Sequence, residues 1–206
     1  MRTRVKICGL TREEDIDAAV AAGADALGFV LWPGSARALD PGHLARLAAR
    51  VPAFVTRVGL FVDQDDEFIR RCTPYLDLIQ FHGDESPEAC RRAPLAWVKA
   101  LRMREGIDLH AAAEAYREAR ALLLDAYRPG VPGGTGEVFD WSRIPANLAK
   151  PVILAGGLTP DNVGEAVRRV RPFAVDVSGG VEAARGIKDP AKLHAFTEHV
   201  NLIPES

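Results

Sequence analysis

The residues best suited to acid–base chemistry lie near the N-terminus, in the segment VKICGLT, residues 5–11. This segment predicts a short strand that ends at Gly9, with Thr11 as the cap of a following helix, so Lys6 and Cys8 point to one face. A thiol at a strand end can act as a base or a nucleophile once it is ionised. The structural alternative for Cys8 is a small, buried apolar side chain.

A second candidate for proton transfer is Asp125, in the apolar segment ALLLDA, residues 121–126. Asp125 takes the same place at the end of its strand that Cys8 takes in the first one. Burial behind three leucines can raise the pKa of a carboxyl group, which can then donate a proton near neutral pH. The alternatives are a helix cap and an ion-pair partner of Arg128.

Two glycine-containing segments, LAGGLTPDNV and DVSGGVE, are suited to binding a phosphate. Each follows an apolar strand, and free backbone N–H groups in such loops bind anions. The alternative is that these glycines only form tight turns. The candidate phosphate ligands are Gly156, Gly157, Ser178, Gly179 and Gly180.

Three further side chains are candidates for substrate contact. Arg37 is the only charged residue of the segment LWPGSARAL, and its guanidinium could bind a carboxylate through two hydrogen bonds. Gln80 and His82 lie in phase in IQFHGDE, at the end of another strand. A solvated loop arginine and a structural histidine are the alternatives.

Strand-like and helix-like segments alternate along the whole chain, which predicts an α/β fold of a single domain, residues 1–206, a (β/α)8 TIM barrel. A doubly wound open sheet is the alternative, but its glycine fingerprint and a P-loop are absent. The expected strands are residues 4–8, 24–31, 54–62, 76–81, 96–101, 121–126, 151–156 and 173–178. The expected helices begin near Arg12, Pro41, Asp65, Ser86, Asp108, Trp141, Pro160 and Pro190.

In such a barrel, the catalytic groups lie at the C-terminal ends of the strands. The last strand pairs with the first, so Asp176 is the expected partner of buried Lys6. The competing interpretation makes Lys6 or Lys99 a Schiff-base nucleophile. The glycine-rich segment 130–141 is longer than a simple connection needs and is predicted to be a lid or ligand-clasping loop.

Composition narrows the class of protein. The chain has 206 residues, a formal net charge of −2, and no run of about 20 apolar residues, which disfavours nucleic-acid and membrane partners. Three cysteines without close pairing and no signal-like N-terminus predict a cytoplasmic location. No Cys or His pair has metal-ligand spacing, and we expect neither a metal nor an organic cofactor. The oligomeric state is not fixed by the sequence, and a homodimer is left open.

Together the segments KICGLT, SARAL, QFHGDE, LLLDA, GGTGEVFDW, AGGLTPDNV and VDVSGGVE, followed by GIKD, resemble those of the phosphoribosylanthranilate isomerases of tryptophan biosynthesis. The likeness covers nearly the whole chain. It implies an Amadori rearrangement of N-(5-phosphoribosyl)anthranilate, a small phosphorylated substrate. It further implies that Asp125 is the general acid, Cys8 the general base, and Arg37 the ligand of the anthranilate carboxylate.

Two positions depart from the family pattern. Gly179 stands where a second serine is usual, which a phosphate site of backbone N–H groups tolerates. Glu137 stands where a basic residue can follow the glycines, which affects only contacts of the predicted lid. The rival functions are another phosphate-binding TIM-barrel enzyme and a non-catalytic sugar-phosphate-binding barrel, neither of which accounts for both Cys8 and Asp125.

Overall fold

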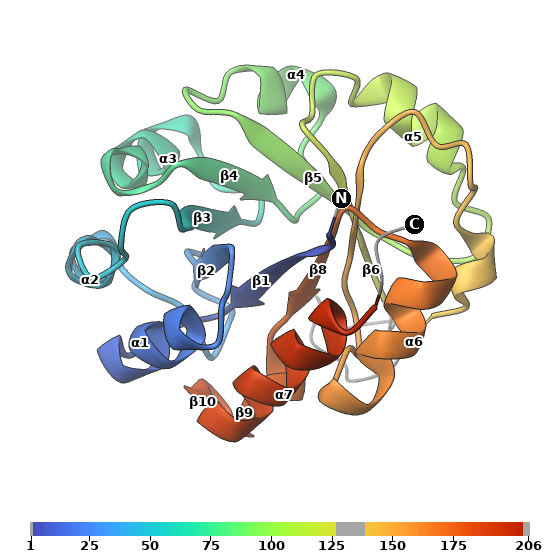
Figure 1. The fold of residues 1–206 in the computed structure, drawn as a ribbon. Coiled ribbons are helices and arrows are strands. Elements are labelled where there is room, and N and C mark those ends of the chain that lie inside the picture. Colours follow the sequence, from blue (N-terminus) through green and yellow to red (C-terminus); the bar gives the residue numbers. More distant parts are fainter. Residues whose placement is uncertain (1, 127–138, 204–206) are drawn as a thin grey trace.

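Eight parallel strands close into one barrel, in which each strand pairs with the next and β8 pairs with β1 (Figure 1). The structure is a computed structural model and describes residues 2–126 and 139–203. The predicted fold class is thereby confirmed. The strands are β1 (Arg4–Cys8), β2 (Ala26–Val30), β3 (Thr56–Phe61), β4 (Leu78–Phe81), β5 (Trp97–Arg102), β6 (Leu122–Asp125), β7 (Val152–Leu154) and β8 (Ala174–Val177).

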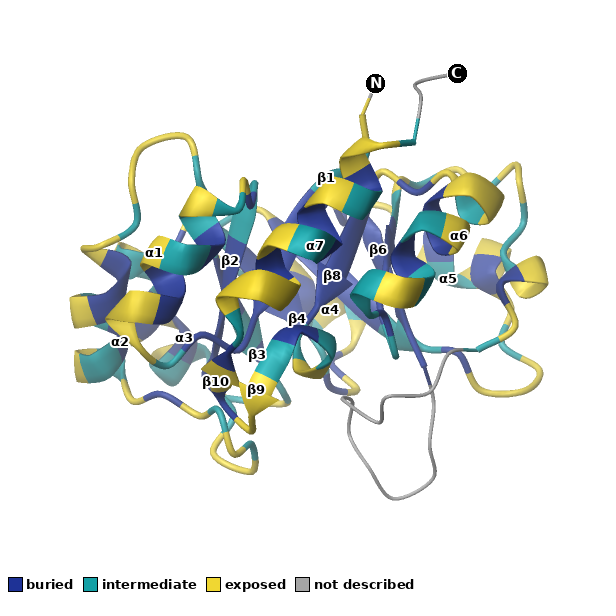
Figure 2. Cartoon of the chain, turned by 60° about the horizontal axis from the view of Figure 1, so that its bottom comes forward, coloured by how far each residue is buried: buried dark blue, intermediate teal, exposed yellow. Residues whose placement is uncertain are grey.

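Helices surround the barrel, and their outer faces are exposed while the strands inside are buried (Figure 2). Apolar runs such as β6 are buried along their whole length, because side chains pack both inside the barrel and against the helices. Within the described ranges the α-helices are α1 (Glu13–Ala21), α2 (Pro41–Ala48), α3 (Asp66–Cys72), α4 (Pro87–Arg91), α5 (Leu109–Ala115), α6 (Pro160–Val170) and α7 (Pro190–Asn201).

Local capping explains why most helix starts were predictable from sequence. The side chains of Asp40, Asp65, Ser86 and Asp108 each accept a hydrogen bond from a backbone N–H of the helix that they precede. Such caps satisfy donors that have no partner within the helix. Proline at the first helical position reinforces four of the predicted starts, because its fixed φ suits a helix and its missing N–H is not needed there.

The helix predicted near Trp141 is wrong: the chain forms only the 3₁₀ turn η2 (Trp141–Arg143) there. An α-helix beginning at Trp141 would set the ring of Pro145 against the carbonyl of Trp141, and this contact ends it after one turn. The preceding predicted lid, residues 130–141, lies outside the described residues except for its last three. Arg128 and Glu137 also lie outside them.

A small hairpin follows β8. The turn η3 (Gly179–Val181) leads into β9 (Glu182–Ala184), which pairs antiparallel with β10 (Ile187–Lys188). Thr11, predicted to cap α1, instead donates its hydroxyl hydrogen to the carbonyl of Gly186 at 2.8 Å, and the residue at the cap position is Arg12. The hairpin is therefore fastened to the β1–α1 loop.

Inside the barrel, Lys6 and Asp176 form the predicted ion pair. They are register partners of β1 and β8, and Lys6 Nζ donates to Asp176 Oδ1 at 2.8 Å. Both side chains are less than 10% exposed. The amine of Lys6 therefore has a structural role.

Lys6→Met is expected to lower the free energy of unfolding by about 3 kcal/mol, because it leaves the Asp176 carboxylate buried without its partner. Urea unfolding at pH 7, followed by circular dichroism, measures the change. The double variant Lys6→Met/Asp176→Leu, which removes both charges, should recover much of the loss. A single variant as stable as the wild type would contradict this account of the pair.

Candidate active site

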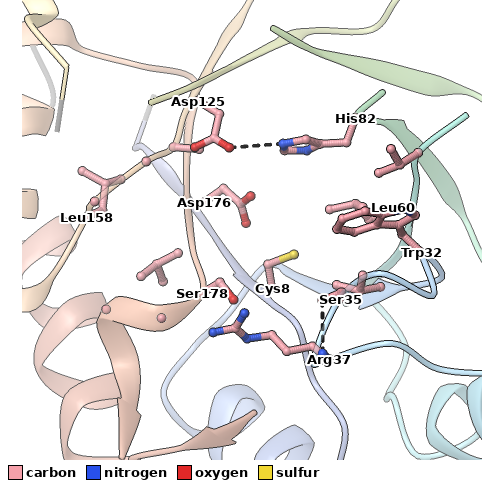
Figure 3. A pocket seen from close by; sticks show the side chains of 18 of the residues that line it. Cys8, Trp32, Ser35, Arg37, Leu60, His82, Asp125, Leu158, Asp176 and Ser178 are labelled. Carbon is pink, nitrogen blue, oxygen red and sulfur yellow. Dashed lines mark hydrogen bonds and ion pairs between the residues drawn. The ribbon is translucent and has the colours of Figure 1, made fainter. Parts of the chain in front are cut away.

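A cavity of about 350 Å³ opens at the C-terminal ends of the barrel strands (Figure 3). With one exception, Gln80, every site residue predicted from the sequence lines it. The predicted residues in its wall are Cys8, Arg37, His82, Asp125, Gly156, Gly157, Ser178, Gly179 and Gly180.

Cys8 ends β1 and is only 5% exposed. Its register partner on β2 is Gly28, and a Cβ added to Gly28 would lie 2.7 Å from Cys8 Sγ and 3.1 Å from Lys6 Nζ. The missing side chain thus lets the thiol and the ammonium group lie side by side. Burial raises the pKa of the Cys8 thiol, and the charge of Lys6 opposes this rise without cancelling it. In the ligand-free protein, Cys8 is therefore a neutral thiol at pH 7.

Asp125 ends β6 and faces the cavity from a different side than Cys8 (Figure 3). Its Oδ2 lies 3.1 Å from Nε2 of His82, and the other ring nitrogen of His82 lies 2.9 Å from Nε2 of Gln80. Gln80 is fully buried and stands behind His82 rather than at the cavity wall. Gln80 and His82, at the end of β4, were both predicted to contact substrate, but only His82 is placed to touch a ligand.

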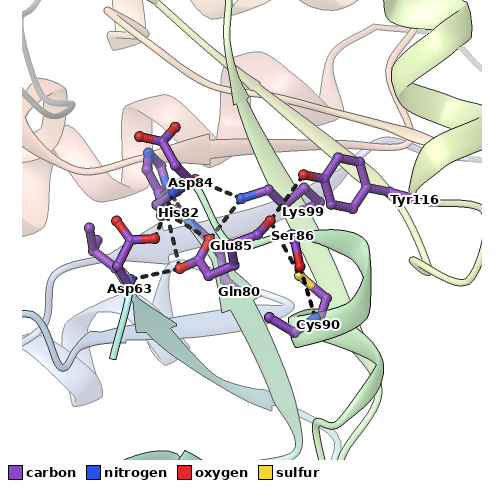
Figure 4. Close-up of polar contacts among 12 residues, drawn as sticks. Asp63, Gln80, His82, Asp84, Glu85, Ser86, Cys90, Lys99 and Tyr116 are labelled. Atoms are coloured by element: carbon purple, nitrogen blue, oxygen red, sulfur yellow. Dashed lines mark hydrogen bonds and ion pairs between the residues drawn. The ribbon is translucent and has the colours of Figure 1, made fainter. Parts of the chain in front are cut away.

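A buried ion pair holds the loop that follows β4 (Figure 4). Lys99 Nζ donates to Glu85 Oε2 and to the carbonyl of Gly83, each at 2.7 Å. Glu85 in turn accepts from the backbone N–H groups of Asp63 and Gly83. Lys99 is thus engaged in fixing the residues next to His82. Since Lys6 and Lys99 both have carboxylate partners and neither lines the cavity, the geometry disfavours the Schiff-base alternative.

The two glycine-containing loops lie against each other. A Cβ on Gly180 would lie 1.9 Å from the carbonyl oxygen of Leu158, so only glycine permits this approach of the loop after β8 to the loop after β7. Gly156 has φ +84 and would clash with Ala126 if it carried a side chain. Asn162 of α6 fixes the first loop, because its side chain donates to the carbonyl of Gly157 at 2.9 Å.

Arg37 reaches the cavity from the loop after β2, and its guanidinium is already bound at one edge. Nε and Nη2 donate to the two carboxylate oxygens of Glu182, each at 2.6 Å. Its Cδ lies 2.4 Å from where a Cβ of Gly9 would stand, so Gly9 makes room for the side chain. The sequence predicted two hydrogen bonds to a ligand carboxylate but not this partner.

Trp32, Glu182 and Lys188 are among the residues in or next to the cavity wall that sequence reasoning missed. Trp32 lines the cavity beside Leu60 and provides an aromatic wall (Figure 3). Its place next to Arg37, directly after an apolar strand, was a usable signal. Glu182 and Lys188 lie in the quoted segments VDVSGGVE and GIKD, but nothing in those letters indicates that they pair.

The described part of the chain, residues 2–126 and 139–203, has neither a cluster of metal ligands nor a membrane-spanning helix. No group of three or more His, Cys, Asp or Glu side chains there could hold a metal ion. No helix in it has the length and apolar character needed to cross a membrane.

The chain is similar along nearly its whole length to proteins of one family. The family model of N-(5'phosphoribosyl)anthranilate (PRA) isomerase matches residues 5–199. The N-(5'-phosphoribosyl)anthranilate isomerase of Chromohalobacter salexigens is 77% identical over 97% of this chain and 95% of its own. Two solved structures of phosphoribosyl anthranilate isomerase from Thermotoga maritima are similar to this chain.

The first of these structures has a TM-score of 0.90, is 40% identical and covers 98% of this chain and all of its own. The second has a TM-score of 0.86 at 38% identity and the same coverage, and is described as monomers generated from a dimeric enzyme. A further phosphoribosyl anthranilate isomerase structure was solved in complex with reduced 1-(o-carboxyphenylamino)-1-deoxyribulose 5-phosphate. It has a TM-score of 0.87, is 39% identical and covers 98% of this chain and all of its own.

Proposed function

Because this chain belongs to the N-(5'-phosphoribosyl)anthranilate isomerase family, we propose that Cys8 is the general base and Asp125 the general acid of the isomerisation that it catalyses. The enzyme converts N-(5-phosphoribosyl)anthranilate, an aldose amine, into 1-(2-carboxyphenylamino)-1-deoxyribulose 5-phosphate, a ketose amine, in tryptophan biosynthesis. One observation carries the assignment: a thiol and a carboxyl group from separate strand ends line the same cavity as two touching glycine loops.

The reaction needs one proton donor and one proton acceptor. Asp125 protonates the ring oxygen of the ribose, so that the C1′–O bond breaks and a cationic Schiff base forms between C1′ and the anthranilate nitrogen. Cys8, as a thiolate, then removes the proton from C2′ and gives an enolamine. This intermediate gains a proton at C1′ and loses the hydroxyl proton at C2′, which yields the ketone. Atoms and electrons balance without a redox partner.

The buried thiol has to ionise during this cycle. Burial raises the pKa of Cys8 in the free enzyme, so the free site holds mostly the wrong protonation state. A cationic Schiff base bound next to the sulfur lowers the pKa of the thiol, because an opposite charge favours the ionised form. The base is therefore generated at the step that uses it.

Two sets of lining residues bind the two anionic groups of the substrate. The loops of Gly157 and Gly180 hold the phosphate through backbone N–H groups, and their mutual contact supports this. Ser178 and Gly179 belong to the loop of Gly180. A second serine is usual at position 179 in the family, but a phosphate site made of backbone N–H groups does not need its side chain. Arg37 binds the anthranilate carboxylate, next to the aromatic wall of Trp32.

Arg37→Ala is expected to raise KM more than it lowers kcat, by about 10-fold or more in KM. A carboxylate contact that is equally strong in the ground and transition states contributes to binding rather than to the chemical step. Steady-state kinetics on freshly prepared phosphoribosylanthranilate separate the two constants. An unchanged KM would show that Arg37 does not touch the substrate.

The activity itself is assayed by the loss of phosphoribosylanthranilate fluorescence after addition of the purified protein, without added metal or cofactor. A non-catalytic sugar-phosphate-binding barrel would bind the product analogue but leave the fluorescence unchanged. Another phosphate-binding TIM-barrel enzyme would likewise fail to consume this substrate.

Three broader assignments belong to the same proposal. Residues 1–206 form one domain, supported by the single barrel of the described residues. The enzyme is a homodimer, supported by the dimeric Thermotoga relative; sedimentation equilibrium tests this. It is cytoplasmic, a location with which three buried free cysteines are compatible.

A further inference from the structure

The guanidinium of Arg37 has two edges that can bind a carboxylate, and one of them is occupied within the protein. Glu182 accepts from Nε and Nη2, which form the side-on edge, at 2.6 Å each. The end-on edge, made by Nη1 and the second hydrogen of Nη2, has no contact with Glu182. Arg37 lines the cavity and its side chain is 17% exposed, so a ligand can reach this second edge.

Glu182 is also held by a second cation, Lys188, which donates to the carboxylate oxygen that accepts from Arg37 Nε. Lys188 Nζ donates to Glu182 Oε1 at 3.0 Å, and the Lys188 side chain has no exposed surface. The same ammonium group donates to the carbonyl of Cys8 at 2.7 Å and to that of Ser178 at 3.1 Å. One buried lysine therefore connects the end of β1, the loop after β8 and the partner of Arg37.

We propose that Glu182 and Lys188 are positioning residues that aim the end-on edge of Arg37 at the substrate carboxylate, and that they thereby set the selectivity of the site for a carboxylated ring. This inference rests on the proposed function, since it takes Arg37 as the ligand of that carboxylate. An arginine side chain that is already held in its binding orientation loses less conformational entropy when the ligand binds than a mobile arginine does.

The charges of the cluster fit this role. Burial alone would raise the pKa of Glu182, but the hydrogen bonds from Arg37 and Lys188 lower it, so Glu182 remains an anion at pH 7. Arg37 and Lys188 are two cations that share this one carboxylate. Burial lowers the pKa of Lys188, and the contact with Glu182 opposes this shift, so the carboxylate both orients Arg37 and favours the charged form of Lys188.

The hairpin that carries both residues is anchored independently of any ligand. The backbone N–H of Lys188 donates to Asp15 of α1 at 3.2 Å, and Lys192 of α7 donates to the carbonyl of Glu182 at 2.8 Å. The bond from Thr11 to Gly186 adds a third anchor. Glu182 therefore occupies a fixed place before the substrate arrives.

The test compares two ligands that differ only in the carboxylate. The first is reduced 1-(o-carboxyphenylamino)-1-deoxyribulose 5-phosphate, and the second is its counterpart with an unsubstituted phenyl ring. Calorimetry gives the Kd of each. We expect Glu182→Gln to raise the Kd of the first ligand about 10-fold and to change the Kd of the second less than about twofold, because the released Arg37 side chain must then be ordered when the carboxylate binds.

Glu114→Gln, on the exposed surface of α5, is the matched control and should change neither Kd. If Glu182→Gln does not fold, Glu182→Asp retains the charge for Lys188 but cannot reach Arg37 as well, and should show the same loss of selectivity. Equal weakening of both ligands, or no weakening of either, would overturn the positioning role.

Arg37→Ala separates this inference from the proposed function. If that variant raises the Kd of both ligands equally, Arg37 does not bind the carboxylate and the assignment of its role fails. If it removes the selectivity while Glu182→Gln and Glu182→Asp retain it, the role of Arg37 stands and only the positioning role of Glu182 is wrong.

Discussion

Asp125→Asn is expected to lower kcat by about two to four orders of magnitude, the usual worth of a positioned proton donor, while the Kd of the reduced product analogue stays within about threefold. Asparagine keeps the shape of the side chain and a polar atom next to His82, but it has no transferable proton near neutral pH. Single-turnover kinetics together with calorimetry separate the loss of chemistry from a loss of binding.

Asp66→Asn, which changes a half-buried carboxylate of α3 away from the cavity in the same way, is the control and should leave kcat unchanged. A full kcat in Asp125→Asn would remove Asp125 as the acid. Weaker binding of the product analogue together with an unchanged kcat would instead show that Asp125 is a binding residue.

Cys8→Ser is expected to lower kcat by a similar or larger factor, again with the product analogue bound almost normally. Serine is nearly the same size as cysteine, so Gly28 and Lys6 keep their contacts. Its hydroxyl, however, is far too weak an acid to supply a base at pH 7. Cys72→Ser, at a buried cysteine of α3 away from the cavity, is the control. A fast Cys8→Ser enzyme would end the assignment of Cys8 as the base.

The pH dependence follows from the direction of the thiol shift. The competent enzyme has Cys8 ionised and Asp125 protonated. Because burial raises the pKa of the Cys8 thiol, the free enzyme holds little thiolate at pH 7, and kcat/KM should rise as the pH is raised toward that pKa. The bound cationic Schiff base favours the thiolate, so the acid limb of kcat should lie at lower pH than that of kcat/KM. Coincident limbs would contradict this route to the thiolate.

The amino-acid sequence by itself determined the barrel and the two groups proposed for catalysis. Apolar strands and capped helices are encoded over a few residues each, as Asp65 and Ser86 show for α3 and α4. Once the alternation indicates a barrel, every strand end lies at one mouth, which is why Cys8 and Asp125 could be placed in one cavity. The Lys6–Asp176 pair was predictable for the same reason, because barrel closure fixes which strands are neighbours.

Only the tertiary structure decided what each side chain binds. The pairing of Arg37 with Glu182 depends on the hairpin of β9 and β10 folding back over the end of β1, across about 145 residues of chain. Similarly, the sequence predicted that Thr11 caps the next helix, but its hydroxyl donates a hydrogen bond to the distant carbonyl of Gly186. Local sequence patterns do not predict such contacts, because the contacts form only when packing brings remote segments together.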